Sequence, residues 1–266
     1  MIRINERQED FKPGLTLLGL RDKMKPDADI VIYNGFPVPD DRDIQDGDEM
    51  VFIKRGETPS REELESLMVS RHSPGVHEKV KNASVGIAGV GGLGSAIAIA
   101  LARLGIGRLV LADFDVVEPS NLNRQQYFVH QIGEKKVEAM KENLERINPY
   151  VTVECHCVKL DSENLPRIYG EVDVLVEAFD RPDMKSMLVN SYFESYPDKY
   201  VVAASGLAGS GNANDIQTRL LGRRLYLVGD RVSAAEPGRG LMAPRVGVAA
   251  HHQANKVLEI ILGGEL

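Results

Sequence analysis

The chain contains only two cysteines, Cys155 and Cys157, among its 266 residues. A structural zinc ion usually takes about four side-chain ligands, often from two cysteine pairs. One pair separated by a single residue cannot supply them, so we expect no structural zinc. Alternation along residues 151–158 instead predicts a strand that carries both thiols on one face, with a redox or weak metal role as the alternative.

The sequence also lacks an excess of positive charge and any long apolar segment. Its formal net charge is −7 and its pI is near 5.5, which argues against a general nucleic-acid or membrane-surface binder. No apolar run approaches the length that spans a bilayer, and residues 1–6 do not resemble a signal-peptide core. We therefore expect a cytoplasmic protein without nucleic-acid or membrane partners.

The most informative segment is an apolar strand, residues 85–88, that runs into a glycine-rich turn and then a helix at 96–102. Glycines let the backbone approach phosphate oxygens, and free N–H groups at a helix start attract negative charge. We expect the phosphate-binding residues of this turn to be Gly89, Gly91, Gly92, Leu93 and Gly94. The glycines alone fit a mononucleotide and a dinucleotide equally well.

The polar residues that follow the second predicted strand (residues 108–112) distinguish a mononucleotide from a dinucleotide. The strand ends at Asp113 and Asp115, near the place where a ribose hydroxyl pair is usually held. Residues 120–126 and 133–136 then bring amides, an arginine and two lysines. A bound dinucleotide has little use for so many donors, whereas a triphosphate that is cleaved needs them to hold departing pyrophosphate.

These motifs resemble the ThiF/MoeB/HesA family, the bacterial relatives of ubiquitin-activating enzymes. The resemblance covers roughly residues 71–264 and is most like the divergent ThiF branch found in thiamine-synthesis settings. It also includes residues 240–247, the family's last strand-to-helix join. The separated motifs that stand in the family's order are residues 89–94, 113–115, 120–125, 133–136 and 177–180.

The resemblance implies ATP-dependent adenylation of the C-terminal glycine carboxylate of a ubiquitin-like sulfur carrier, with release of pyrophosphate. It implies that Asp180 binds Mg²⁺, and that an arginine ahead of the domain reaches the ATP phosphates, sometimes those of a neighbouring subunit. The implied catalytic residues are Arg71, Arg124, Lys136 and Asp180. The implied ATP-binding residues are the glycine turn, Asp113, Asp115, Asn121, Arg124 and Lys136. Arg245 is a further candidate, for contact with the carrier's tail.

The same resemblance implies the partners: a separate carrier ending in Gly-Gly, a sulfur donor protein, and a second copy in a homodimer. Many family members have a paired-cysteine zinc site, and some bond covalently to the carrier through a later cysteine. This chain has no cysteine after Cys157, so we expect adenylation without that covalent step.

The first 57 residues differ from the rest and predict a small β-grasp domain. Apolar runs at 1–5, 30–34 and 50–54 flank a helix at 15–23, for which Thr16 is a possible cap. The run from 31 to 51 resembles ThiS, the ubiquitin-like sulfur carrier. Because Gly56 is followed by Glu57, the domain has no free Gly-Gly carboxylate. We interpret it as a fused structural or regulatory module, with docking as the alternative.

Residues 58–70 predict a helical linker, because Ser60 and Glu63 make a capping box. Residues 71–266 then alternate helices, such as 135–147, with buried apolar runs at 172–176 and 200–204. This alternation predicts an α/β domain with a doubly wound, Rossmann-like, mostly parallel sheet that binds ligands at the carboxyl ends of its strands. Gly263 and Gly264 are expected to end the last helix.

Three other functions fit parts of the sequence. An NAD(P)-dependent oxidoreductase accounts for Gly89, Gly91 and Gly94 but not for the donors after them. A non-catalytic scaffold would bind nucleotide while its own ubiquitin-like domain fills the partner groove. An adenylating enzyme that acts on a modified tRNA base is the third, and the acidic net charge weighs against it.

Overall fold

The computed structural model describes residues 1–5, 7–57, 60, 64 and 75–263. The chain divides into two compact units, Met1–His77 and Glu78–Leu266, and each is described by itself. Apart from positions 60 and 64, the expected linker helix at 58–70 lies outside the described residues, as does Arg71. No helix in the described part of the chain is long and apolar enough to cross a membrane.

Within residues 1–57, as far as they are described, the first unit forms a five-stranded sheet with one helix packed on it, as the sequence predicts. Strand β5 lies between β1, to which it is parallel, and β3, to which it is antiparallel. Thr16 caps the helix, because its side chain accepts a hydrogen bond from Gly19 N. Met50 and Phe52 alternate inward from β5 into the core. The elements are β1 (Ile2–Ile4), β2 (Arg7–Glu9), α1 (Leu17–Met24), β3 (Ile30–Tyr33), β4 (Phe36–Pro37) and β5 (Glu49–Ile53), in the sheet order β2-β1-β5-β3-β4.

The second unit contains a seven-stranded sheet in the order β11-β12-β10-β9-β6-β7-β8. All neighbouring pairs are parallel except β11 with β12, so the predicted mostly parallel, doubly wound sheet is confirmed. Its strands are β6 (Ser84–Ala88), β7 (Arg108–Ala112), β8 (Thr152–His156), β9 (Val174–Glu177), β10 (Tyr200–Ala204), β11 (Gln217–Leu220) and β12 (Leu225–Gly229). Its helices are α3 (Val76–Lys81), α4 (Gly92–Leu104), η1 (Pro119–Asn121), η2 (Val129–Gln131), α5 (Lys136–Ile147), α6 (Asn164–Tyr169), α7 (Pro182–Ser195), η3 (Ala213–Asp215) and α8 (Ala243–Leu262).

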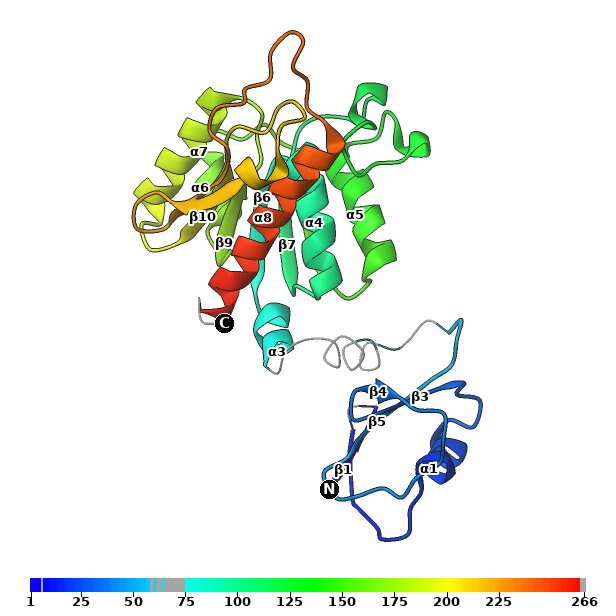
Figure 1. Cartoon of the computed structure of the whole chain (residues 1–266). Helices are drawn as coiled ribbons and strands as arrows, with labels where there is room; N and C mark the ends of the chain where they lie inside the picture. Colours follow the sequence, from blue (N-terminus) through cyan, green and yellow to red (C-terminus); the bar gives the residue numbers. More distant parts are fainter. Residues whose placement is uncertain (6, 58–59, 61–63, 65–74, 264–266) are drawn as a thin grey trace. The chain divides into compact units, whose positions relative to one another are not determined.

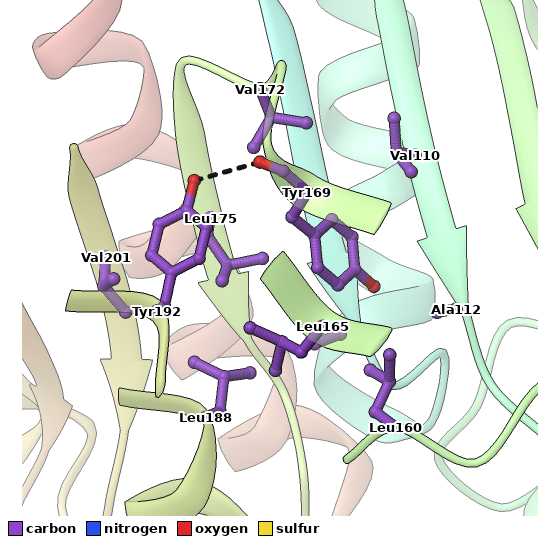
Figure 2. Close-up of a cluster of buried hydrophobic side chains, with 11 residues drawn as sticks. Val110, Ala112, Leu160, Leu165, Tyr169, Val172, Leu175, Leu188, Tyr192 and Val201 are labelled. Atoms are coloured by element: carbon purple, nitrogen blue, oxygen red, sulfur yellow. Dashed lines mark hydrogen bonds between the residues drawn. The ribbon is translucent and has the colours of Figure 1, made fainter. Parts of the chain in front are cut away.

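Helices cover both faces of this sheet (Figure 1). Helices α4, α5 and α8 pack on one face, and α6 and α7 pack together on the other. Figure 2 shows the core under α6 and α7, where Tyr192 donates a hydrogen bond to the Tyr169 carbonyl at 3.2 Å. The Tyr169 hydroxyl donates to Ile87 O at 2.9 Å. Both buried tyrosines therefore satisfy their polar ends within an otherwise apolar core.

Element boundaries differ from the sequence prediction where side chains intervene. Strand β9 begins at Val174 rather than at residue 172, because the Asp173 carboxylate there accepts a hydrogen bond from Ser84 N. Strand β8 ends at His156, so Cys157 lies past its end and is exposed. Gly263 ends α8 with φ 90°, as expected for a helix-terminating glycine.

We predict that Gly86→Ala destabilises the second unit. Gly86 lies in β6 under a buried ring, and a Cβ there would be 2.5 Å from Tyr169 Cδ1. Overpacking a core costs about 1–3 kcal/mol, and urea unfolding of the full chain measures the loss. Gly247→Ala in α8, where a Cβ has nothing within 4 Å, is the control and should gain up to about 1 kcal/mol. Equal stability of the two variants would contradict the packing argument.

Candidate functional site

A cavity of about 630 Å³ lies where the parallel strands of the second unit end. Parallel strands point their carboxyl ends to one edge of a sheet, and ligands of such sheets bind in the crevice at that edge. The walls come from the loops after β6, β7, β8, β9, β10 and β12 and from the start of α5. Its volume is in the range of small-molecule sites.

The glycine turn after β6 forms one wall through Gly89, Gly91, Gly92 and Leu93. Gly89 has φ 89°, and a Cβ there would be 3.1 Å from the Ala178 carbonyl oxygen. Gly94 does not line the cavity. A Cβ on Gly94 would be 1.9 Å from Gly89 O, so this glycine lets α4 start directly against the turn.

Asp113 fastens this turn to the end of β7. One carboxylate oxygen accepts from Val90 N at 2.8 Å, and the other accepts from Asp115 N at 2.9 Å. Both aspartates line the cavity. The carboxylate therefore fixes the turn even without a ligand, and the remaining lone pairs stay available.

Lys136 reaches the cavity from the first residue of α5. Its Nζ lies 2.8 Å from Asp115 Oδ2, and its side chain is only 7% exposed. The Tyr127 hydroxyl donates to Val90 O at 2.7 Å and lies 3.3 Å from Lys136 O. Burial is the main cause that raises the pKa of Tyr127, so this tyrosine remains a donor that links the glycine turn to the lysine.

Arg124 also lines the cavity, whereas Asn121 does not. Arg124 Nη1 donates to Ser120 O at 3.2 Å and to Asn123 Oδ1 at 2.8 Å. Asn121 is buried, and its Oδ1 accepts from Glu118 N at 3.1 Å, which closes the η1 turn. The side chain of Asn121 is thus used to close η1, and a phosphate contact by Asn121 stays a prediction.

Asp180 stands on the loop after β9, and a buried carboxylate holds that loop in place. Glu177, which has no exposed surface, accepts from Lys185 Nζ at 2.8 and 3.0 Å and from Phe179 N at 2.7 Å. Burial raises the pKa of Glu177, and Lys185 opposes that shift. The carbonyl of Glu177 accepts from Gln253 of α8 at 3.0 Å. These bonds tie the Asp180 loop to both neighbouring helices.

A magnesium ion at Asp180 fits the donor set of the cavity. Among the described residues, no group of three or more His, Cys, Asp and Glu side chains could hold a metal. Magnesium usually takes one or two carboxylates, water and substrate phosphates. The exposed carboxylate of Asp180 on the cavity wall is therefore sufficient when a nucleotide supplies phosphate oxygens.

A second buried ion pair holds the wall formed by the loops after β10 and β12. Arg245 is 5% exposed, and its Nη2 lies 2.7 Å from Asp230 Oδ2. Its Nη1 donates to Asn212 O at 2.8 Å. Arg245 does not line the cavity, and its guanidinium is bonded to partners inside the protein. Its expected contact with a carrier tail stays a prediction.

The cavity contains functional candidates that the sequence argument missed. Gln125 directly follows the predicted site residue Arg124 in the sequence. Its buried Oε1 has no hydrogen-bond partner among the described residues. Lys185 follows Asp180 by five residues, on the first turns of α7. No sequence pattern pointed to Lys159 or Arg231, which arrive on loops from distant strands.

The cavity wall carries more positive than negative charge. Its cationic residues are Arg124, Lys136, Lys159, Arg181, Lys185 and Arg231, and its acidic residues are Asp113, Asp115 and Asp180. Six cations against three acids give a formal surplus of three positive charges among the lining residues, and counting Glu177 and Asp183, which pair with Lys185 and Arg181, leaves a surplus of one in a chain whose net charge is −7. This local field favours a small polyanion.

We predict that Lys185→Met lowers the free energy of unfolding by about 3 kcal/mol, because it leaves the Glu177 carboxylate buried without its ion-pair partner. The double variant Glu177→Gln/Lys185→Met should recover most of this loss. Arg146→Met, which breaks an exposed pair with Glu142, should cost less than about 1 kcal/mol. Urea unfolding measures the free energy of each variant. Equal losses in Lys185→Met and Arg146→Met would rule out the buried-pair argument.

We predict that Asp230 makes the fold acid-sensitive. Burial alone raises the pKa of Asp230, but bonds from Ser233, Val232 and Arg245 outweigh it and the net pKa is lowered. A lowered folded-state pKa stabilises the fold above the unfolded value of about 3.9, and this stabilisation is lost as pH falls through and below it. Thermal melts from pH 7 to pH 2.5 should therefore be less pH-dependent in Asp230→Asn. The exposed Asp198→Asn is the control, and identical slopes would contradict the assignment.

Comparison with known proteins identifies both parts of the chain. Residues 64–265 match the ThiF family, and residues 1–56 match the ThiS-like ubiquitin family. The Escherichia coli molybdopterin-synthase adenylyltransferase is 31% identical over 192 residues, which are 70% of this chain and 76% of that protein. The Thermus thermophilus sulfur carrier protein adenylyltransferase is 36% identical over 126 residues, 46% of this chain and 46% of that protein.

Other relatives are longer than this chain. The adenylyltransferase and sulfurtransferase UBA4 of Candida glabrata is 31% identical over 192 residues, 70% of this chain but only 44% of that protein. Among solved structures, Escherichia coli tRNA N6-threonylcarbamoyladenosine dehydratase, TcdA, in complex with ATP has a TM-score of 0.69 at 20% identity, over 78% of this chain and 98% of that chain. That likeness shows the shared fold. With three quarters of its length matched by the family, the chain belongs to the ThiF family.

Proposed function

We propose that this chain uses ATP to adenylate the C-terminal glycine carboxylate of a ubiquitin-like sulfur carrier protein. One observation carries the proposal: Arg124, Lys136 at the start of α5, and Asp180 on the loop after β9 line a single cavity together with the glycine turn. An oxidoreductase cofactor has no need of this combination. A triphosphate that loses pyrophosphate does, because negative charge on the leaving group must be held.

The chemistry requires binding and charge stabilisation rather than a protein nucleophile. A carboxylate oxygen of the carrier attacks the α-phosphorus of ATP. The bond from that phosphorus to the oxygen bridging to the β-phosphate breaks, and its electron pair leaves with pyrophosphate. The product is an acyl-adenylate. Because the attacking carboxylate is already ionised near neutral pH, no general base is needed.

The residues divide between the two ends of the nucleotide. The N–H groups of the glycine turn hold phosphate oxygens, and Lys136 and Arg124 add positive charge there. Asp113 and Asp115, at the end of β7, hold the ribose hydroxyls. Asp180 would hold Mg²⁺ together with phosphate oxygens, and the ion would neutralise part of the charge on pyrophosphate. Lys136 is released toward the phosphates from its 2.8 Å pair with Asp115.

The loops after β10 and β12 support a slender second substrate. They bring small residues to the cavity wall, among them Gly206, Ala208, Ala234 and Ala235, together with the larger Leu207 and Val232. An extended Gly-Gly tail has no side chains and suits a wall with many small residues. The names of the relatives agree with this proposal: two are adenylyltransferases for molybdopterin synthase and for a sulfur carrier protein.

The finer assignments form part of the same proposal. The ThiS-like match over residues 1–56 supports a carrier of the ThiS type and a place in thiazole synthesis for thiamine. A separate carrier is needed because the fused domain continues past Gly56. We further propose a sulfur donor protein, a cytoplasmic homodimer, and a phosphate contact from Arg71, which lies outside the described residues.

The proposal predicts ATP–pyrophosphate exchange in the presence of ATP, Mg²⁺ and a ThiS-type carrier ending in Gly-Gly. Asp180→Ala and Lys136→Ala should each lower the exchange rate by about 100-fold or more, as expected when one charge-stabilising group is removed from a site. Arg146→Ala on the outside of α5 should leave it unchanged. Radiolabelled pyrophosphate incorporation into ATP is the measurement.

A panel of Gly-Gly-ending carriers decides between the alternatives. No exchange with any carrier would remove the proposal. Nucleotide binding without exchange would then favour the scaffold, and binding of a nicotinamide dinucleotide would favour the oxidoreductase.

A further inference from the structure

Arg231, on the loop after β12, has a backbone conformation that is rare for its residue type. Its φ is +64°, in the left-handed region. The other described non-glycine residues with positive φ are Asn5 and Asn34, and asparagine tolerates this region far better than arginine does. Such strain persists only where the surroundings enforce it, and it is concentrated at ligand sites.

The surroundings of Arg231 enforce the strain from both sides. Its N–H donates to Ser205 O at 3.0 Å. The preceding Asp230 carboxylate accepts from Val232 N and Ser233 N, each at 2.8 Å, and is itself held by Arg245. The chain is therefore curled around Asp230, and the Arg231 side chain is left on the cavity wall.

The guanidinium of Arg231 has no partner within the part of the chain that the structure describes. Most other cavity cations have one: Arg124, Lys136, Arg181 and Lys185 all bond to neighbouring oxygens. Lys159 also has no side-chain partner there, but it lies after β8, beside the proposed ribose end. An unpaired guanidinium fixed on a cavity wall presents five donors to carbonyl or carboxylate oxygens.

The order of strands indicates which substrate these donors meet. The residues proposed to bind the ribose follow β7, and the glycine turn proposed to bind the phosphates follows β6. Arg231 follows β12, three strands away from β6. Neighbouring strands are roughly 4.8 Å apart, so β12 lies about 14 Å from β6. Arg231 thus stands among the small residues that the loops after β10 and β12 bring to the cavity wall, rather than beside the glycine turn.

We propose that Arg231 binds the carboxylate-ended tail of the acyl substrate and not the nucleotide. This inference rests on the proposed function, since it assigns a residue to the second substrate of that reaction. The guanidinium donates to oxygens of the extended tail and so sets the affinity for it. The left-handed backbone at Arg231 lets the chain curl around Asp230 while Arg231 lies on the cavity wall.

The test compares Arg231→Gly with wild type in ATP–pyrophosphate exchange, with a ThiS-type carrier ending in Gly-Gly. We expect KM for the carrier to rise about tenfold, the effect of losing one charged hydrogen bond. KM for ATP and kcat at saturating carrier should stay within about twofold. Because glycine adopts left-handed φ without strain, the melting temperature should be equal or higher. Arg231→Lys, which keeps the charge, should recover part of the carrier affinity.

Arg239→Ala is the matched control, since Arg239 lies on the same loop, pairs with Glu236 at 3.7 Å and does not line the cavity. It should leave both KM values unchanged. Wild-type exchange with an unchanged carrier KM in Arg231→Gly would overturn the inference alone. So would an equal rise in KM for ATP, or a lower melting temperature that accounts for the loss. Absence of exchange by wild type with every carrier would overturn the proposed function and this inference with it.

Discussion

The buried carboxylate of Glu177 is the constraint on which the cavity depends. It bonds to Lys185 of α7, to Phe179 N on the following loop, and more weakly to Ala204 N at the end of β10. One group therefore fixes the ends of two neighbouring strands and a helix. Asp113 acts in the same way at the glycine turn, and Asp230 does so at the far wall. Carboxylates that hold the backbone in place thus surround a site whose proposed ligand is itself anionic.

This arrangement gives a site that is largely formed before any ligand arrives. Four of the six positive groups on the wall are held by neighbouring oxygens, as Lys136 is by Asp115 at 2.8 Å. A phosphate of the proposed ligand would exchange one oxygen partner for another, with little rearrangement of the backbone. Preorganised charge of this kind costs no reorganisation during a reaction. It also explains the importance of the buried tyrosine Tyr127, which joins the turn to the helix that carries the lysine.

The fold of both units could be predicted because apolar runs and helix caps in the sequence indicate their strands and helices. Apolar runs such as Tyr200–Ala204 became strands with the expected bounds, and Thr16 capped its helix. The sequence also predicted that Arg124, Lys136 and Asp180 lie at one cavity, because motifs at the ends of parallel strands share one edge of the sheet. It did not predict that the side chain of Asn121 closes η1, or that Arg245 pairs with Asp230. The pairing of Arg245 depends on Asp230 and Asn212, which are 15 and 33 residues away in the chain. Arg231 is distinguished by a backbone angle that no residue pattern encodes.

The charge of the cavity wall differs in sign from the net charge of the chain. The chain as a whole is acidic, with a net charge of −7, while the cavity wall has a surplus of cations. At distances beyond about 8–10 Å in physiological salt, solvent ions screen the attraction of the cavity. An anion is therefore attracted only once it comes within this distance of the cavity wall, and the net charge of the chain adds no attraction from farther away.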